Sequence, residues 1–220
     1  MKKKLIIVLA LLLVLCGCHK EEKQTDGQRF KQEYEALNGQ KDADGKSYST
    51  IEIKEDSPVH YVELEKIAEL LENGTHVIYM GWPECPYCRR AVPVLMDTVS
   101  EYEGMSVYYC SMKDARQAYK DGLDNESAKL YKQIADICKN SAFDFTTVTD
   151  TLEDGTLNLV ASMMIFVQQG EIIGCHKRTV DSQIDPYEPL SETQVEKLKD
   201  IYKAYLEDMA YNKQPACSGC

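Results

Sequence analysis

No apolar run in this 220-residue chain is long enough to cross a membrane as a permanent helix. The longest, Leu5 to Leu15, has 11 residues, whereas a spanning helix needs roughly 20. Lys2, Lys3 and Lys4 precede this run, and a short apolar run behind a positively charged start is typical of a signal peptide. We therefore expect export from the cytoplasm, with residues 1–17 as the leader.

The end of the leader indicates a lipid anchor. Leu15-Cys16-Gly17-Cys18 resembles a bacterial lipobox, in which small residues precede the cysteine that receives diacylglycerol. Cys18 fits that position better than Cys16, because the bulky Leu15 directly precedes Cys16. We expect a lipid on Cys18 and a location at the extracytoplasmic face of the cell membrane. An ordinary cleaved signal peptide, or an uncleaved anchor, is the alternative.

Positive charge is also scarce. The chain has 25 Lys and Arg residues against 36 Asp and Glu residues, a formal net charge of −11. Removal of residues 1–17 deletes three lysines and no acid, which leaves 22 basic against 36 acidic residues, or about −14. An acidic surface disfavours binding to nucleic acid and broad docking on anionic lipid. Membrane attachment would therefore depend on the lipid at Cys18.

Cysteine, by contrast, is abundant. Nine cysteines would be unusual in a reducing cytosol, whereas disulfides form and persist outside it. The cysteine content and the leader therefore both predict an exported protein.

The chain has no internal repeat, and its length suits one globular domain with tails. Polar and charged residues dominate 18–46, which we expect to be a flexible tether. Residues 47–211 would form an α/β domain, and 212–220 a cysteine-containing tail. Hydrophobic periodicity predicts the order β-α-β-α-β-α-β-β-α, a central mixed sheet flanked by helices. The expected strands are 49–54, 75–81, 105–110, 161–168 and 171–176, and the expected helices are 60–72, 89–102, 125–139 and 191–211, with an irregular segment at 141–158.

The strongest chemical signal is the stretch Trp82-Pro83-Glu84-Cys85-Pro86-Tyr87-Cys88-Arg89-Arg90, between a predicted strand and a predicted helix. This setting places both sulfurs in the first helical turn, where they can form a small disulfide ring and reopen it. The helix N-terminus and neighbouring cations favour a thiolate. We expect Cys85 to be the nucleophile and Cys88 to resolve the mixed disulfide. A permanent disulfide, or half of a zinc site, is the alternative.

Charged neighbours are expected to tune the nucleophile. Arg89 and Arg90 would lower the pKa of Cys85, and Glu84 would raise it.

The remaining cysteines leave several alternatives open. Cys217-Ser218-Gly219-Cys220 ends the chain as an inert local disulfide, a redox arm that exchanges electrons with the first pair, or part of a shared metal site. The long gap between the pairs disfavours the metal, and we expect no metal and no other cofactor. Three further cysteines lie in apolar contexts and are expected to be free and buried, with a bridge between the first two as the alternative: Cys110, Cys138 and Cys175.

From about residue 47 to 211 the chain resembles the thioredoxin superfamily in three separate features. Cys85-Pro86-Tyr87-Cys88 follows a predicted strand. Pro93, five residues after Cys88, stands where the active-site helix of that family carries a kinking proline. Met163 to Gly174 resembles the penultimate strand, tight turn and edge strand of the family. Together with the leader, the stretch Gly81 to Arg89 resembles the lipoprotein-like thioredoxins of Gram-positive bacteria, some of which are called bacteriocin transport accessory proteins.

The resemblance implies a thioredoxin-like fold and a membrane-anchored thiol–disulfide oxidoreductase. Its substrates would be disulfides or thiols of exported proteins and peptides, with a second protein as redox partner. Ala161 and Ser162 would face the disulfide, and the Ala161 backbone would pair with an extended substrate. Three residues would add a surface for the substrate, or simply pack around the loop: Trp82, Pro86 and Tyr87. A non-catalytic binding module for a secretion partner, a peptide or a metal is the alternative.

The chain lacks two residues that this family usually has. No proline lies between Pro93 and Pro186, so Ser162 stands where the family has a cis-proline. A non-proline cis bond costs about 3–4 kcal/mol, so we expect a trans bond before Ser162 and an altered substrate groove. Six residues before Cys85, Tyr79 replaces the buried Asp that manages the proton of the second cysteine, and a phenol is a poor base at neutral pH. Both departures favour the binding module.

Overall fold

The computed structural model describes residues 24–211. Its elements, in chain order, are α2 (Asp26–Glu35), β1 (Val59–Tyr61), α3 (Leu64–Glu72), β2 (His76–Met80), α4 (Pro86–Val99), β3 (Val107–Cys110), α5 (Lys113–Lys120), α6 (Glu126–Asn140), the short 3-10 helix η1 (Phe145–Thr147), β4 (Met163–Gln168), β5 (Glu171–Lys177) and α7 (Glu192–Tyr211). Within this range no helix is long and apolar enough to span a bilayer.

The strands form one mixed sheet of five, in the order β1-β3-β2-β4-β5. β1, β3 and β2 run parallel to one another, while β4 is antiparallel to β2 and to β5. Tyr79 of β2 lies at the centre, paired with Tyr109 of β3 and Met164 of β4. The prediction of an α/β domain with a mixed sheet flanked by helices is confirmed.

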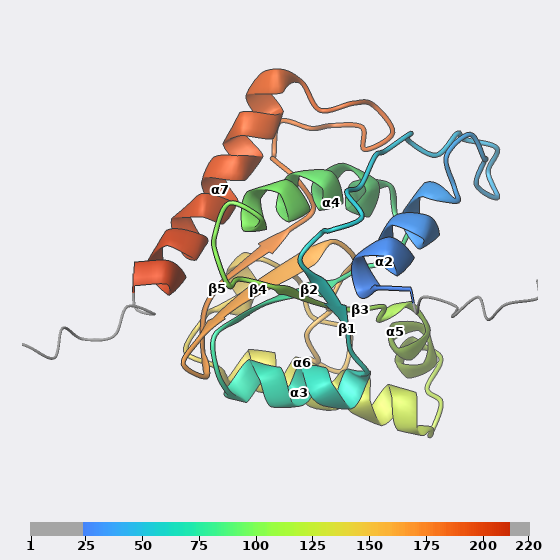
Figure 1. Cartoon of the computed structure of the whole chain (residues 1–220). Helices are drawn as coiled ribbons and strands as arrows, with labels where there is room; N and C mark the ends of the chain where they lie inside the picture. The colour runs from blue at the N-terminus through green and yellow to red at the C-terminus, as the bar shows by residue number, and fades with distance from the viewer. Residues whose placement is uncertain (1–23, 212–220) are drawn as a thin grey trace, which may run out of the picture.

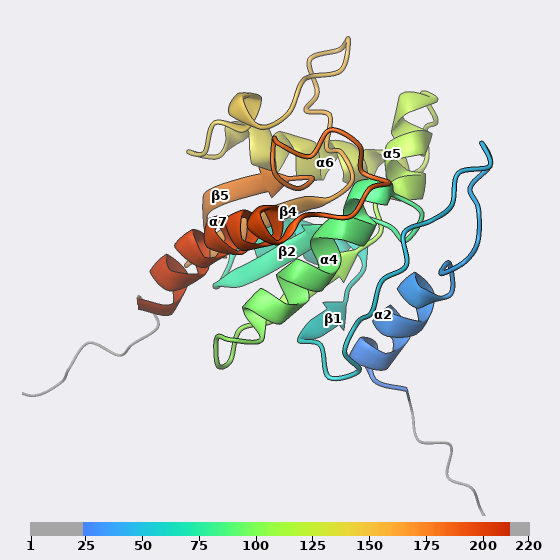
Figure 2. The same ribbon diagram turned by 90° about the horizontal axis from the view of Figure 1, so that it is seen from above.

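Side chains of β2 alternate between two hydrophobic layers, because successive residues of a strand point to opposite faces. Val77 and Tyr79 pack on one face with helices α2, α4 and α7, whereas Ile78 and Met80 pack on the other with α3, α5 and α6. Figure 1 shows the two groups of helices above and below the sheet. Seen from above, α4 lies between α7 and α2 (Figure 2).

The flexible tether expected over residues 18–46 is corrected from residue 24 onward. Thr25 begins α2 with a capping box that it shares with Gln28, and the helix brings Phe30 and Tyr34 into the core with no exposed surface. The Phe30 ring contacts the Tyr109 ring of β3 at 5.0 Å between centroids. Burial of two large aromatic rings stabilises a short, otherwise polar helix. Residues 18–23 lie outside the described range.

The strand expected at 49–54 is also corrected. Its alternation correctly marks Ile51 and Ile53 as buried, but the segment is extended without a partner strand. Side chains satisfy its backbone instead, because the Ile51 N–H donates to Asn38 Oδ1 at 3.1 Å and the Ile53 N–H to Glu35 Oε1 at 2.7 Å. The first strand of the sheet is β1, within the range where a helix was expected to begin.

Two further differences concern helices. Lys113–Lys120 forms α5, which the sequence analysis did not predict, and η1 lies within the segment expected to be irregular. The other predicted strands and helices lie within a few residues of the observed ones. The predicted leader, residues 1–17, and the tail at 212–220 lie outside the described residues.

Candidate active site

Cys85 and Cys88 lie at the start of α4, directly beyond the end of β2. Cys85 is the N-cap residue, and Pro86 occupies the first helical turn, where its missing N–H and fixed φ fit the helix. The Cys88 N–H donates to Cys85 Sγ at 3.4 Å. Both thiols are free. The structure places both sulfurs in the first turn of α4, as the sequence predicts.

The two sulfurs differ in exposure and in acidity. Cys85 is 8% exposed and Cys88 is 0% exposed. A hydrogen bond from the Cys88 thiol is the largest effect that lowers the pKa of Cys85, with further contributions from the N–H groups of Cys88 and Tyr87 and from the charge of Arg178. Burial, followed by the neighbouring Cys85, raises the pKa of Cys88 well above its ordinary value. Cys85 is therefore the sulfur set up to ionise first.

The cation near Cys85 is Arg178, which the sequence analysis did not single out. Arg178 directly follows β5, and its guanidinium lies over the Tyr87 ring at 5.0 Å from the centroid. Among the charged residues, it is the one that contributes to the lowered pKa of Cys85. Its position directly after the predicted edge strand could have indicated this role, since the end of β5 pairs with the start of β4 near the cysteines.

Arg89, predicted to tune the pKa of Cys85, has a different role. Its side chain is 0% exposed and binds the N-terminal segment instead of the sulfur. Nη1 donates to the Tyr34 carbonyl at 2.6 Å, and Nε and Nη2 donate to the Ser49 carbonyl at 2.9 and 2.7 Å. Nη2 also donates to Asn38 Oδ1 at 2.7 Å. The fork geometry of a guanidinium satisfies several buried carbonyls at once, and an effect of Arg89 on the pKa of Cys85 stays a prediction.

The other charged neighbours are also held by partners. Glu84 forms an ion pair with Lys113 of α5 at 2.8 Å, which lowers the pKa of Glu84 against the opposing effect of burial. Arg90 donates from Nη2 to the Tyr187 carbonyl at 2.6 Å and from Nε to the Pro186 carbonyl at 3.3 Å. Arg90 thereby ties α4 to the loop that precedes α7.

The segment expected to face substrate lies in the same cluster as the cysteines. Ala161, Trp82 and Tyr87 are half-buried and pack against the core that contains both sulfurs. Ser162 is fully buried with a left-handed φ of 58°, and residues 24–211 contain no cis peptide bond, so the bond before Ser162 is trans as expected. The predicted residues are therefore brought together around the pair.

A pocket of about 330 Å³ opens beside the cysteines. It is lined by residues from the start of α4, the end of β5 and the end of η1, among them Tyr87, His176, Lys177, Arg178 and Thr147. A larger hollow of about 770 Å³ lies between α3, α6 and the β4–β5 turn. Gly170 of that turn hydrogen-bonds Gly74, which precedes β2, so the larger hollow is at the opposite end of the sheet from Cys85.

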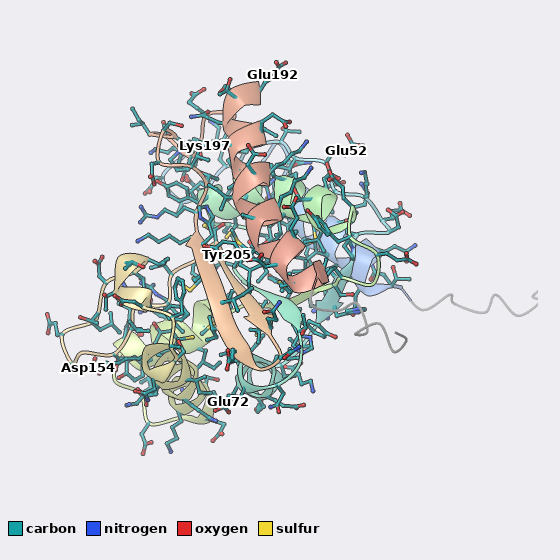
Figure 3. All side chains as sticks on the ribbon, turned by 90° about the vertical axis from the view of Figure 1, so that its left-hand side faces the viewer. Glu52, Glu72, Asp154, Glu192, Lys197 and Tyr205 are labelled. Carbon is teal, nitrogen blue, oxygen red and sulfur yellow. The ribbon has the colours of Figure 1, made fainter. Side chains whose placement is uncertain are left out.

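Two glycines keep room for large side chains near the site. A Cβ at Gly81 would clash with the Tyr79 hydroxyl and with Cys88 Sγ, which shows that these two groups meet at the end of β2. A Cβ at Gly174 of β5 would clash with the Tyr205 ring. Figure 3 shows Tyr205 on α7, where that helix crosses the last strands of the sheet. The Tyr205 ring also stacks on Phe166 at 4.5 Å.

The remaining described cysteines are buried and poorly acidic. Cys110, Cys138 and Cys175 are free, as expected, and the alternative bridge between Cys110 and Cys138 is not formed. Burial raises the pKa of all three, that of Cys110 to about 12. Over residues 24–211 there is no group of three or more His, Cys, Asp or Glu side chains that could hold a metal ion. Cys18, Cys217 and Cys220 lie outside the described residues.

No protein-family model matches the sequence of this chain, and no curated protein matches it either. The geometry of the cysteine pair is therefore the main ground on which a function can be inferred.

Proposed function

We propose that this chain is a thiol–disulfide oxidoreductase with Cys85 and Cys88 as its redox pair. The observation that carries the proposal is the contrast between the two sulfurs within one helical turn. The pKa of Cys85 is lowered and this residue is still 8% exposed, whereas Cys88 is 0% exposed and its pKa is raised. Such a pair has one sulfur suited to attack a substrate and a second suited to resolve the mixed disulfide.

A thioredoxin-like fold is part of the proposal. It is supported by the five-stranded mixed sheet with helices on both faces and by the position of the cysteines after the central strand β2. Pro93 lies inside α4, as the resemblance implies. Helices α2 and α5 are additional to the order that hydrophobic periodicity predicts.

In the reducing direction, the Cys85 thiolate attacks one sulfur of a substrate disulfide. A Cys85–substrate bond forms, and the other substrate sulfur leaves as a thiolate that solvent protonates. Cys88 then loses its proton and attacks Cys85 Sγ, so that the Cys85–Cys88 disulfide forms and the second substrate sulfur leaves and is protonated. Two electrons pass to the substrate, and the reverse sequence oxidises a dithiol substrate. A redox partner protein returns the pair to its starting state.

The substrate of this proposal is an exported protein or peptide. The chain itself would be held at the extracytoplasmic face of the membrane by the lipid on Cys18. An extended substrate would lie along Ala161 and Ser162, with Trp82, Pro86 and Tyr87 as its apolar surface. The left-handed backbone of Ser162 gives this groove a different shape from one opened by a cis-proline.

Reduction of insulin disulfides tests the function. Wild-type protein is expected to turn over, Cys85→Ser to be inactive, and Cys88→Ser to accumulate a mixed disulfide visible as an increase in mass. Cys110→Ser, at a buried cysteine in the other hydrophobic layer, is the matched control and is expected to retain activity.

The observation that favours a binding module is that Tyr79 and Ser162 replace the two usual helpers of the pair. If wild type and Cys85→Ser are equally inert towards several disulfide substrates, the enzyme proposal is wrong and the binding module replaces it.

A further inference from the structure

The buried sulfur Cys88 is surrounded by tyrosine hydroxyls from different parts of the chain. The Tyr79 hydroxyl of β2 and Cys88 Sγ lie close together, because a Cβ added at Gly81 would clash with both of them. The Tyr79 hydroxyl oxygen also lies 3.0 Å from that of Tyr34 on α2. Tyr109 of β3 and Tyr202 of α7 also interact with Cys88 electrostatically. Tyr34, Tyr79 and Tyr202 are completely buried, and Tyr109 is 2% exposed. Four elements thus place a phenol near one sulfur.

The Tyr202 hydroxyl has a further property. Within residues 24–211 it has no hydrogen-bond partner, although it is fully buried. An unsatisfied buried hydroxyl costs about 1–3 kcal/mol, so its retention needs a reason. Tyr202 lies in the same core cluster as Cys88 and interacts with it electrostatically, so the dipole of this hydroxyl can turn towards the negative charge that Cys88 carries only during the reaction.

We propose that Tyr79, held in place by Tyr34 of α2, is a positioning residue that donates a hydrogen bond to the Cys88 thiolate during release of the substrate. This inference rests on the proposed function and deepens it. The hydroxyls take the place of a carboxylate beside Cys88, and they act as donors to the thiolate without accepting its proton.

The step balances without any further reactant. Cys88 gives up its S–H proton, its sulfur bonds to Cys85 Sγ, and the Cys85–substrate bond breaks. The departing substrate thiolate takes up one proton, so the proton count is unchanged across the step. Tyr79 keeps its own proton throughout, because burial and the nearby Cys88 raise the pKa of Tyr79 well above its ordinary value.

Few titratable groups near Cys88 could change the pH dependence of its reaction. The titratable groups that face it are Cys85 from the start of α4 and the phenols of α2, β2, β3 and α7 named above. All four phenols have raised pKa values, so they remain neutral where Cys85 ionises. Two neighbours lower the pKa of Cys88 against its burial, the Tyr79 hydroxyl first and the Trp82 backbone second.

Ellman's reagent separates the two sulfurs in one experiment. Its first equivalent of thionitrobenzoate is released when Cys85 attacks, and its second when Cys88 resolves the mixed disulfide. The full chain in detergent is used, with serine at the four cysteines outside the described residues, Cys16, Cys18, Cys217 and Cys220. A matched protein with Cys85→Ser and Cys88→Ser provides the baseline for the buried thiols.

In Tyr79→Phe the second phase is expected to slow roughly tenfold or more near neutral pH, and its pH dependence is expected to move to higher pH. The first phase should change little. Tyr34→Phe should shift the second phase in the same direction by a smaller factor. Tyr202→Phe should slow it without lowering the denaturation midpoint, because no existing hydrogen bond is lost.

Tyr131→Phe is the control for a general effect of losing a buried hydroxyl. Tyr131 is fully buried in the other hydrophobic layer, and its hydroxyl hydrogen-bonds Leu157 and Leu159. The inference is overturned if Tyr79→Phe leaves the second phase and its pH profile unchanged, or if Tyr131→Phe slows that phase equally. If the first phase is missing in the wild type, the proposed function itself fails. This result differs from a failure of the role of Tyr79, which affects the second phase alone.

Discussion

The backbone N–H of Arg178 donates a hydrogen bond to the carbonyl oxygen of Ser162 at 2.6 Å, and both residues have left-handed backbones, with φ of 62° and 58°. This bond joins the residue after β5 to the residue before β4. Both residues lie at the end of the sheet where β2 leads to Cys85. A left-handed conformation costs a non-glycine residue roughly 1–2 kcal/mol. Two such residues beside the proposed redox pair indicate a loop shape that function retains at a cost in stability.

The backbone of Ser162 can be tested by substitution. Ser162→Pro is expected to lower the free energy of unfolding by at least about 2 kcal/mol, because the proline ring cannot adopt a positive φ. Ser162→Gly should be neutral or stabilise by up to about 1 kcal/mol, since the only side-chain bond lost is a weak one of 3.5 Å to the Arg178 carbonyl. Urea unfolding measures both. Gln169→Gly, at another left-handed residue with φ of 51°, is the control away from the cysteines. Equal stability of the Pro and Gly variants would contradict this prediction.

Arg178 should govern the acidity of Cys85. In Arg178→Gln the pKa of Cys85 is expected to rise, because a nearby positive charge is lost. The higher pKa lowers the thiolate fraction, so alkylation by iodoacetamide near neutral pH should slow by roughly threefold, and added salt should reduce the difference. Lys177→Gln, one residue earlier in the same pocket, is the matched control and should change the rate less. Similar slowing in both variants would mean that Arg178 has no specific role.

Arg89 should govern stability instead of reactivity. Arg89→Met leaves the carbonyls of Tyr34 and Ser49 without their buried donor, and we expect a loss of about 3 kcal/mol or more in unfolding free energy. Arg89→Lys should lose less, since an ammonium keeps the charge but not the fork. Limited proteolysis between residues 36 and 50 should accelerate in both. Slower alkylation of Cys85 in a variant of unchanged stability would instead support the role in pKa tuning that the sequence suggested.

The buried thiols and phenols predict a loss of stability at alkaline pH. Burial raises the pKa of Cys88, Cys110, Cys138 and Cys175 above the ordinary value of 9.0, so the native state holds protons that the unfolded chain releases. The stabilisation is complete below about pH 9 and is lost as the pH rises towards the folded values, by several kcal/mol by about pH 10.

Denaturant unfolding at a series of pH values measures this loss. Cys138→Ala should flatten the curve, because it removes one of the titrating groups. A stability that stays constant or increases above pH 9 would contradict the prediction.

The sequence predicted the position of Cys85 and Cys88 at the start of a helix, because the signal for that position is local. The apolar run of β2, the spacing of Cys85 and Cys88 and the proline at the helix start all act within a few residues, where backbone geometry leaves few alternatives. Side-chain partners were harder to predict. The sequence placed Arg89 beside Cys85, but a side chain four residues further along a helix starts on the same face and can still turn towards other acceptors.

Helix α2 was missed for a related reason. Apart from its capping box, the segment is polar, and its stability depends on two aromatic rings that find their partners on strand β3. Phe30 and Tyr34 are four residues apart, and two apolar residues make too short a pattern to distinguish a helix from a flexible tether.

The sequence by itself determined that two cysteines occupy the first turn of a helix behind a buried strand, because those are short-range consequences of spacing and propensity. Only the tertiary structure decided which groups surround the two sulfurs. Arg178 reaches Cys85 through the pairing of β4 with β5, and Tyr34 reaches Tyr79 through the docking of α2. Acidity depends on burial and on neighbours within a few ångströms, and in a folded chain those neighbours come from distant parts of the sequence.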